Sequence, residues 1–406
     1  MRLVALVCLF FFAAPASARA TELDPSKIDR VAASKHWLRL LHYKTSWFLK
    51  TRSLVDGPEF FFSPTGKTDA KAELLATVEA FSKDIKTGRL KQHPQCAFPE
   101  RFRYLKRELA PALDAIKTVA CPLLDEYVEK FHAKSATLVF SSAFPNNPGS
   151  MFGHTFLRIN STESDDKKKK NDLLDYGISY AASVPPTDNG FQFAILGMGG
   201  GYLGAFTVMP YYAKVNEYSN SESRDLWEYD LDLTPAQTET IVRHVWELET
   251  NSWFDYYFFD ENCSYILLSL LEVARDDWDL TDFAIYVIPG ETVKKIAQVP
   301  GAVVDVKFRP SLRKRLFQKL AVLSAAERQT VFDTVAGKVS ADKLSDTRTL
   351  ESVTAYLFYL KQKASQKLSD DQNRILQTAL LRRSELGVAT NDAALPEIRP
   401  DSRPDL

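Results

Sequence analysis

The spacing of apolar residues changes twice along the chain. From residue 24 to about 124, and again from 310 to 385, apolar residues recur at the three- and four-residue spacing of amphipathic helices. Between these regions the pattern shortens to the alternation typical of strands, with turn residues between the runs. The expected strands, in chain order, are 137–140, 154–159, 175–181, 191–196, 203–209 and 226–231. Their close succession predicts an antiparallel sheet.

Two helices are expected directly after these strands. The segment Thr234-Pro235-Ala236-Gln237 has a capping-box pattern with proline at the first helical position, and we expect its helix to end near Glu249. A second helix follows Asn262, a good N-cap, and residues 265–274 are apolar around almost its whole circumference. Such a helix belongs in a core, with only its first turn, at Cys263, accessible.

These patterns predict an α+β protein in which an antiparallel sheet packs on a buried, cysteine-bearing helix, flanked by helical regions at both ends. The start of the chain has an apolar run followed by small residues, which is typical of a cleavable signal peptide. The expected boundaries are a signal peptide at 1–20, a helical N-terminal domain at 21–124, a central domain at 125–300, a helical C-terminal region at 301–388 and a disordered tail at 389–406.

Residues 191–209 contain only Gln192 as a strongly polar residue and are long enough to cross a membrane. Several glycines in this stretch disfavour a helix and suit a turn between buried strands: Gly197, Gly199, Gly200, Gly201 and Gly204. We therefore expect a glycine-rich hairpin. The alternative is an apolar surface that makes a peripheral membrane contact.

The charge balance gives little sign of a charged partner. The chain has 51 Lys and Arg residues against 52 Asp and Glu residues, so it lacks the basic excess of nucleic-acid-binding proteins. The run Lys167 to Lys170 is interpreted as a solvated loop tip, with a lipid-phosphate contact as the alternative. No second metal-type residue stands at helical spacing from His42, and we expect neither a metal nor a cofactor. The oligomeric state stays open.

Cysteine usage leaves one thiol to explain. Cys8 lies within the signal peptide, whereas Cys96 and Cys121 flank one helical segment and make a plausible disulfide in an oxidising compartment. Other pairings stay open, but this one leaves Cys263 free. At a helix N-terminus, unpaired N–H groups favour a thiolate and can bind an oxyanion. The alternative role for Cys263 is that of a small buried residue.

A cysteine nucleophile needs a base within hydrogen-bond reach. His154 begins an expected strand directly after Gly153, where the backbone can approach closely. Its alternative role is that of a satisfied polar residue at a strand start. Structural or surface roles are expected for the other histidines: His36, His42, His93, His132 and His244. A histidine on a strand and a cysteine opening a buried helix, in this order, fit a circularly permuted papain-like site, because geometry rather than chain order defines such sites.

Several ordered motifs carry a family resemblance. They are Asn-Pro-Gly-Ser-Met-Phe-Gly-His-Thr-Phe-Leu-Arg at 147–158, Gly-Gly-Tyr-Leu-Gly-Ala-Phe at 200–206, Pro-Tyr-Tyr-Ala-Lys-Val-Asn-Glu-Tyr at 210–218, Arg-Asp-Leu-Trp-Glu-Tyr-Asp-Leu at 224–231 and Glu-Asn-Cys-Ser-Tyr at 261–265. Together they resemble the periplasmic domain of the bacterial lipoprotein N-acyltransferase Lnb over about residues 125–300. The Asn-Cys pair also resembles lecithin:retinol acyltransferase, another permuted papain-like enzyme. A periplasmic location is implied.

The resemblance implies thioester chemistry. Cys263 would attack an ester carbonyl of a phospholipid or lipoprotein, His154 would take and return the proton, and the acyl group would pass to an amine. Asp175 is the first candidate for a third member that orients His154, with a strand-end surface role as its alternative. Oxyanion or substrate contacts are expected from the residues around the two motifs: Asn262, Tyr256, Tyr257, Ser150 and Gly153.

The chain departs from the family after the matched region. Lnb acyltransferases carry a membrane-embedded region there, whereas residues 301–386 hold many charges and no apolar run long enough to span. The leading hypothesis is therefore a periplasmic acyltransferase or acyl hydrolase on lipid or lipoprotein esters. A papain-like amidase or endopeptidase on cell-wall peptides and a non-catalytic envelope lipid- or protein-binding module remain as alternatives.

Overall fold

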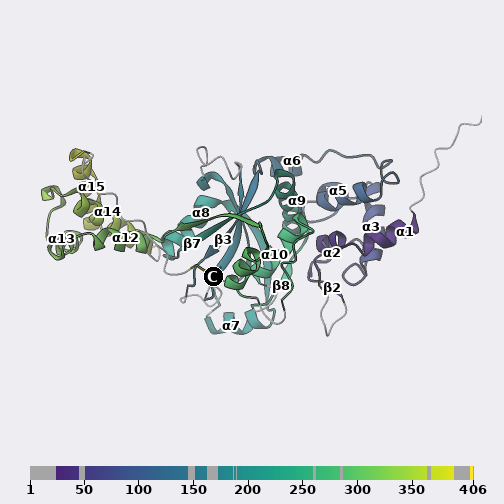
Figure 1. The fold of residues 1–406 in the computed structure, drawn as a ribbon, viewed down its shortest axis with the longest axis horizontal. Coiled ribbons are helices and arrows are strands. Elements are labelled where there is room, and N and C mark those ends of the chain that lie inside the picture. The colour runs from purple at the N-terminus through teal and green to yellow at the C-terminus, as the bar shows by residue number, and fades with distance from the viewer. Residues whose placement is uncertain are drawn as a thin grey trace, which may run out of the picture.

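The computed structural model describes residues 24–44, 51–144, 151–161, 172–185, 187–188, 190–258, 262–283, 287–363, 367–387 and 403–405. The predicted signal peptide, Ser150 and the lysine run at 167–170 lie outside these residues. A central sheet is flanked by helical regions on both sides, so the molecule is elongated (Figure 1).

The N-terminal region is built from short capped helices and a two-stranded ribbon. Its elements are α1 (Pro25–Ala32), α2 (Lys35–Leu40), β1 (Tyr43–Lys44), β2 (Arg52–Ser53), η1 (Pro58–Phe60), α3 (Ala70–Ser82), α4 (Pro94–Ala97) and α5 (Pro99–Glu108), and α6 (Pro122–Glu129) leads to the sheet. The side chains of Asp24, Ser34 and Asp69 accept hydrogen bonds from the first backbone amides of α1, α2 and α3. Trp37 and Leu40 are completely buried and join the main core.

All strands of the central sheet pair antiparallel, which confirms that prediction. The sheet order is β8-β6-β5-β4-β3-β7-β9. The strands are β3 (Ser135–Ser141), β4 (His154–Asn160), β5 (Tyr176–Ser183), β6 (Tyr202–Pro210), β7 (Leu226–Leu231), β8 (Phe254–Tyr256) and β9 (Val303–Arg309). The edge strands β8 and β9 were not predicted. Strand β8 is very short, and β9 lies where helix was expected and is only partly buried.

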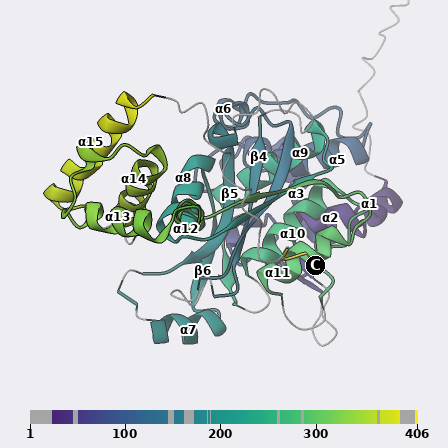
Figure 2. The ribbon, with the colours of Figure 1, turned by 60° about the vertical axis from the view of Figure 1, so that its left-hand side comes forward.

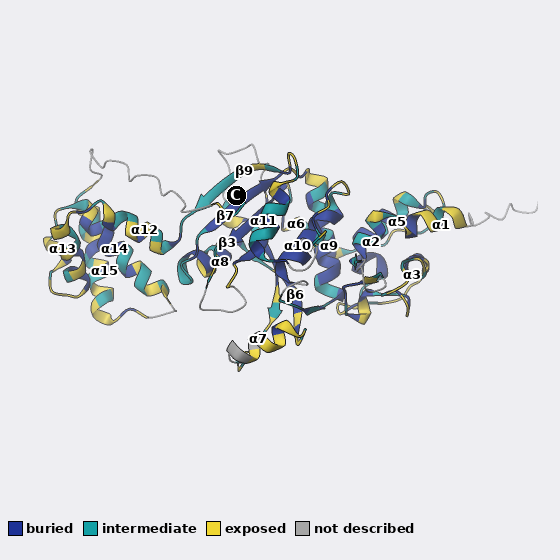
Figure 3. Cartoon of the chain, turned by 60° about the horizontal axis from the view of Figure 1, so that its bottom comes forward, coloured by how far each residue is buried: buried dark blue, intermediate teal, exposed yellow. Residues whose placement is uncertain are grey.

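The strand predicted at 191–196 is wrong, because these residues belong to helix α7 (Gly190–Met198) between β5 and β6. Short apolar runs fit strands and helices equally well. The glycines end this helix instead of forming a hairpin turn: Gly201 N–H donates to Leu196 C=O at 2.7 Å, and Gly200 adopts a φ of +73°. Helix α7 projects from the central domain with much of its surface exposed (Figure 3).

Different helices cover the two faces of the sheet. Helix α9 (Pro235–Asn251) begins with the predicted capping box of Thr234 and Gln237. Helix α10 (Cys263–Ala274) is buried along almost its whole length and packs with α9, α2 and α11 (Pro289–Ala297) around β4 and β5 (Figures 1 and 2). The opposite face carries α8 (Tyr211–Val215), the π-helical turn η4 (Asn216–Ser221) and a smaller core.

The C-terminal helices have a core of their own. They are α12 (Leu312–Ala321), α13 (Ala325–Val335), α14 (Thr347–Gln362) and α15 (Asp370–Glu385), with the short η5 (Ala341–Lys343). Of the tail expected at 389–406, residues 403–405 are described, and Asp405 accepts a 3.0 Å hydrogen bond from the Tyr229 hydroxyl of β7. Among the described residues, no helix combines the length and apolar character that membrane crossing requires.

Candidate functional site

Asn262 fixes the turn that presents Cys263. Its Oδ1 accepts hydrogen bonds from the amides of Ser264 at 3.0 Å and Tyr265 at 3.3 Å, as an N-cap does. Its Nδ2 donates to the carbonyl oxygens of Phe258 and Val287. All polar atoms of this side chain therefore hold local backbone, so Asn262 positions the cysteine and is not turned toward a substrate.

The Cys263 thiol lies among hydrogen-bond donors on the face of β4 that carries Thr155. Thr155 Oγ1 and Ser264 Oγ are 3.2 Å apart, and Cys263 Sγ is 3.9 Å from Ser264 Oγ. Burial raises the pKa of Cys263, whereas hydrogen bonds from the Thr155 amide and from both hydroxyls lower it. Cys263 is 3% exposed, and burial prevails. The resting group is thus a neutral thiol with donors already placed to receive a thiolate.

The two expected tyrosines have different surroundings. Tyr256, on β8, is buried beside Cys263, and burial followed by the charge of a Cys263 thiolate raises its pKa well above the usual value, while a hydrogen bond from the Cys263 amide lowers it. Tyr257 packs instead against the end of α7, since a Cβ on Gly200 would lie 2.4 Å from its Cζ atom. Only Tyr256 lies at the thiol.

His154 is the first residue of β4, and its ring lies on the other side of the strand from Thr155. The ring centre is 5.6 Å from that of Tyr218 and 6.4 Å from that of Phe156. Burial, with Arg224 and Lys214 nearby, lowers the pKa of His154 to about 3. Its Nε2 atom is buried and has no hydrogen-bond partner in the described part of the chain.

The structure brings His154 and Cys263 to the same end of β4 but not into a hydrogen bond with each other. The amide of the peptide bond that joins His154 to Thr155 lies near enough to the Cys263 thiol to lower its pKa. The imidazole itself points to the opposite face, because successive side chains along a strand alternate. A change of the His154 rotamer would be needed to bring the two groups into contact.

Asp175 lies away from this strand end. It comes just before β5, whose Tyr176 pairs with Ile159 near the far end of β4. Strand geometry puts this position roughly 20 Å from His154. Asp175 Oδ1 accepts hydrogen bonds from the amide and hydroxyl of Ser161, at 3.0 Å and 2.9 Å. Asp175 is therefore not a carboxylate partner of His154 in this structure. The sequence could not show this, because it does not reveal the strand register.

Three residues around His154 were not singled out from the sequence. Tyr218 lies in the π-helical turn η4, and the cationic groups of Lys214 and Arg224 lie 5.3 Å and 5.0 Å from its ring centre. Such π-helical turns often occur at functional sites. The motifs at 210–218 and 224–231 contain all three residues, so these motifs are the sequence signal by which the residues could have been identified.

Gly153 and the predicted disulfide have clear structural roles. Gly153 adopts a φ of +99°, and a Cβ there would lie 2.7 Å from the Phe140 ring, so only glycine fits this entry into β4. Cys96 and Cys121 form the predicted disulfide, and Cys263 is free. No group of three or more His, Cys, Asp or Glu residues in the described ranges is arranged to hold a metal ion.

Comparison with known proteins covers two segments of the chain. Residues 29–108 match a domain of unknown function, and residues 124–299 match the family described as the Lnb N-terminal periplasmic domain. No curated protein and no solved structure matched. The second match contains both His154 and Cys263 and confirms the resemblance found in the motifs. Residues 124–299 are thus similar to the Lnb N-terminal periplasmic domain family, and this similarity supports a periplasmic location in the cell envelope.

Proposed function

We propose that residues 124–299 form a thiol-dependent acyltransferase or acyl hydrolase that acts on phospholipid or lipoprotein esters. The observation that carries this proposal is the free Cys263 thiol at the start of α10, surrounded by donors from Thr155, Ser264 and Tyr256. These groups suit a nucleophile whose charge develops only during attack. The match to the Lnb family agrees with ester chemistry but leaves the activity to be tested.

The proposed reaction has two halves. Cys263 Sγ attacks the ester carbonyl while its proton passes to a base, the carbon–oxygen bond breaks, and the alcohol leaves with the proton. An amine or water then attacks the thioester, receives the acyl group and returns a proton to the sulfur. The backbone amide of Cys263 and the Tyr256 hydroxyl are the proposed donors to the carbonyl oxygen.

His154 is the proposed base, in a circularly permuted papain-like arrangement. Burial, together with Arg224 and Lys214, lowers its pKa, so the resting imidazole is neutral and is a weak base; its Nε2 atom has no partner within the described structure. His154 would take the thiol proton only when bound substrate stabilises the imidazolium. Because the imidazole lies on the face of β4 opposite the thiol, this role requires His154 to move to the thiol. The two groups would then form a neutral pair that becomes charged only when substrate is bound. This differs from a resting thiolate–imidazolium pair.

We also propose that α7 brings this site to a lipid surface, which is the partner that its exposed apolar side chains fit. Ile195, Leu196 and Met198 on α7 are 49%, 40% and 54% exposed, and Leu203 beside it is 51% exposed. The sequence has no charged residue from 189 to 213. Exposed apolar clusters of this kind mark protein or membrane contacts, and we propose the membrane contact.

Helix α7 is joined directly to the segment that carries Tyr256. The Phe258 amide donates to the Gly197 carbonyl at 2.9 Å, and a Cβ on Gly197 would lie 2.4 Å from the Phe258 ring. Tyr202, just after α7, pairs with Tyr256 across β6 and β8. A lipid held at α7 would therefore lie next to strand β8, whose Tyr256 hydroxyl faces Cys263.

The test is to incubate the mature protein and its Cys263→Ala variant with phospholipid vesicles, a diacylated lipopeptide and peptidoglycan fragments. Product release from lipid esters, an acyl adduct on Cys263 detected by mass spectrometry, and loss of both in the variant would support the proposal. Thermal unfolding of the two proteins should be alike. Cleavage of peptidoglycan alone would favour the amidase or endopeptidase, and binding without any product would favour the non-catalytic module.

A further inference from the structure

A second polar centre is buried where the N-terminal region meets α9 and α10. Glu247 Oε2 is 2.8 Å from His244 Nδ1, and His244 Nε2 is 3.0 Å from His42 Nε2. His42 Nδ1 in turn is 3.1 Å from Ser269 Oγ, which lies on the helix that Cys263 begins. Glu247 and both histidines are buried. A continuous hydrogen-bonded chain therefore runs from α9, through the N-terminal region, to α10.

The hydrogen bond between His42 and Ser269 fixes which group donates and which accepts in every other bond of this hydrogen-bonded chain. Ser269 Oγ donates its single proton to the Ile266 carbonyl at 2.8 Å, so it can only accept from His42. A neutral His42 that donates from Nδ1 must accept at Nε2, and His244 must then donate from Nε2 and accept at Nδ1. The donor to His244 Nδ1 is Glu247, which therefore carries a proton.

The surroundings of Glu247 agree with a neutral carboxyl. Its Oε1 accepts hydrogen bonds from the amides of Glu100 at 2.6 Å and Arg101 at 2.9 Å. The Arg101 guanidinium is already matched by Glu73 at 3.1 Å, and both side chains are fully buried. A carboxylate on Glu247 would add a second buried negative charge beside one cation, which burial disfavours.

The remaining charged groups near the chain do not change this balance. The Glu100 carboxylate pairs with Arg103 at 3.0 Å, and His36 pairs with Asp276 at 2.9 Å at the edge of the interface. Burial raises the pKa of Glu247 to about 7 and lowers that of His244 well below its usual value. Below about pH 7, the centre therefore holds one proton on the carboxyl and two neutral rings.

We propose that Glu247, His244 and His42 are positioning residues that act through Ser269 to hold α10, and with it Cys263, against the N-terminal region. The consequence for catalysis rests on the proposed function, whereas the hydrogen-bond order itself does not. The chain joins a segment of the domain of unknown function to two helices of the Lnb-like domain. The N-terminal region would thus be a working part of the catalytic unit.

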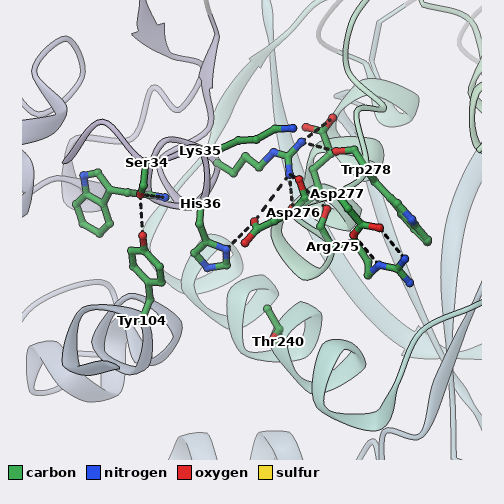
Figure 4. Close-up of polar contacts among 12 residues, drawn as sticks. Ser34, Lys35, His36, Tyr104, Thr240, Arg275, Asp276, Asp277 and Trp278 are labelled. Carbon is green, nitrogen blue, oxygen red and sulfur yellow. Dashed lines mark hydrogen bonds and ion pairs between the residues drawn. The ribbon is translucent and has the colours of Figure 1, made fainter. Parts of the chain in front are cut away.

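A second contact holds the C-terminal end of α10 to the same region. Arg39, on α2, donates to the carbonyl oxygens of Glu272 at 3.2 Å and Arg275 at 3.3 Å, and also to that of Trp278. Figure 4 shows this interface, with His36 turned toward Asp276 and the Arg275–Asp277 pair beside it. Cationic donors at a helix C-terminus satisfy its free carbonyls. Helix α10 is therefore held at its middle and at its end.

Loss of the Glu247 proton would exchange the donor and acceptor roles all along the hydrogen-bonded chain. A carboxylate must accept from His244 Nδ1, so His42 must donate from Nε2 and accept at Nδ1. Ser269 would then have to donate to His42 and give up the Ile266 carbonyl. The folded state binds this proton over the range between about 4.5, the ordinary value, and about 7, so the free energy of unfolding falls as pH rises through that range.

The test uses Glu247→Gln, whose amide copies the protonated carboxyl: its NH₂ group donates to His244 and its oxygen accepts the two backbone amides. Histidine ¹⁵N NMR reports which ring nitrogen carries the proton. At about pH 6 we expect the proton on Nδ1 of His42 and on Nε2 of His244, with the opposite order above about pH 8 in the native protein but not in Glu247→Gln. Glu239→Gln, a change at a partly buried position on the same helix, should behave like the native protein.

Unfolding and activity give two further readouts. The native unfolding temperature should fall as pH rises from about 4.5 to about 7, and Glu247→Gln should remove that fall, whereas Glu247→Ala should unfold earlier at both pH values. If esters are hydrolysed, Ser269→Ala should lower kcat with KM unchanged. The opposite ring protons at about pH 6, or equal unfolding of the Gln and Ala variants, would overturn the proposal. Absence of esterase activity would count against the proposed function alone, because the NMR and unfolding results do not depend on it.

Discussion

Replacing Asn262 by alanine should loosen the start of α10 far more than an ordinary cap replacement does. The change removes the two bonds that Oδ1 accepts, for which N-cap substitutions cost about 1 kcal/mol. It also leaves the carbonyls of Phe258 and Val287 without their Nδ2 donor, at about 1 kcal/mol each. The local opening free energy should therefore fall by about 3 kcal/mol.

Alkylation of Cys263 measures this opening directly, since the thiol is buried and is the free cysteine of the described chain. When opening is fast and transient, the alkylation rate follows the open population, so about 3 kcal/mol corresponds to roughly a 100-fold faster reaction with iodoacetamide. The rate should be followed by intact-protein mass spectrometry in native buffer. Asn262→Ser keeps a cap oxygen and loses the two donations of Nδ2, so its rate should lie between those of the native protein and the alanine variant.

Thr234→Ala is the matched control, because it removes an exposed capping box from α9 and should cost about 1 kcal/mol. That helix start does not enclose the thiol, so Cys263 alkylation should stay near the native rate. A rate for Asn262→Ala within about threefold of the native rate would refute the reasoning, since the opening cost would then be below about 1 kcal/mol. An equal acceleration by Thr234→Ala would show global loosening instead.

Three further predictions concern pH and lipid. The pH at half-maximal Cys263 alkylation should lie above that of an ordinary thiol, because burial raises the pKa; a midpoint below it that is lost in His154→Ala would show instead a resting ion pair. Arg158 and Arg309 hold the pKa of Glu228 at about 2, below its ordinary value, so stability present at neutral pH should be lost as pH falls from about 4.5 to about 2. Glu228→Gln should lose part of that acid sensitivity in urea titrations, and an unchanged profile would contradict it. Leu196→Asp and Met198→Asp should weaken flotation with phospholipid vesicles, whereas Leu381→Asp, an equally apolar exposed site on α15, should not.

Local signals along the chain predicted the elements that depend on neighbours in sequence. The capping box at Thr234, the N-cap at Asn262 and the strand at 226–231 all occur where the sequence indicates, because their stabilising contacts are a few residues away. The strand predicted at 191–196 was wrong because a short apolar run fits a strand and a helix equally well. The glycines of this segment pack against Phe258 and Tyr257, and such contacts with distant residues cannot be predicted from the local sequence.

The candidate site shows the same division. Cys263 at a helix start and Gly153 before a strand follow from local chemistry. The placement of Asp175 depends on which residues β4 and β5 pair, and the face taken by His154 depends on alternation from a strand start that the sequence fixes only to within a residue. Contacts such as His42 with His244 join residues about 200 positions apart, so no pattern in the sequence connects them.

The ladder between β5 and β6 runs unbroken from Tyr176 opposite Pro210 to Ser183 opposite Leu203, so the pairing of these strands is complete before α7 begins. Helix α7 is therefore an insert at the tip of a hairpin that is already formed. Evolution, or an engineer, can exchange such a tip without rebuilding the sheet beneath it. Transplanting a different tip would therefore change the proposed lipid-facing surface separately from the helix that carries the thiol, so location and the proposed chemistry could be altered one at a time.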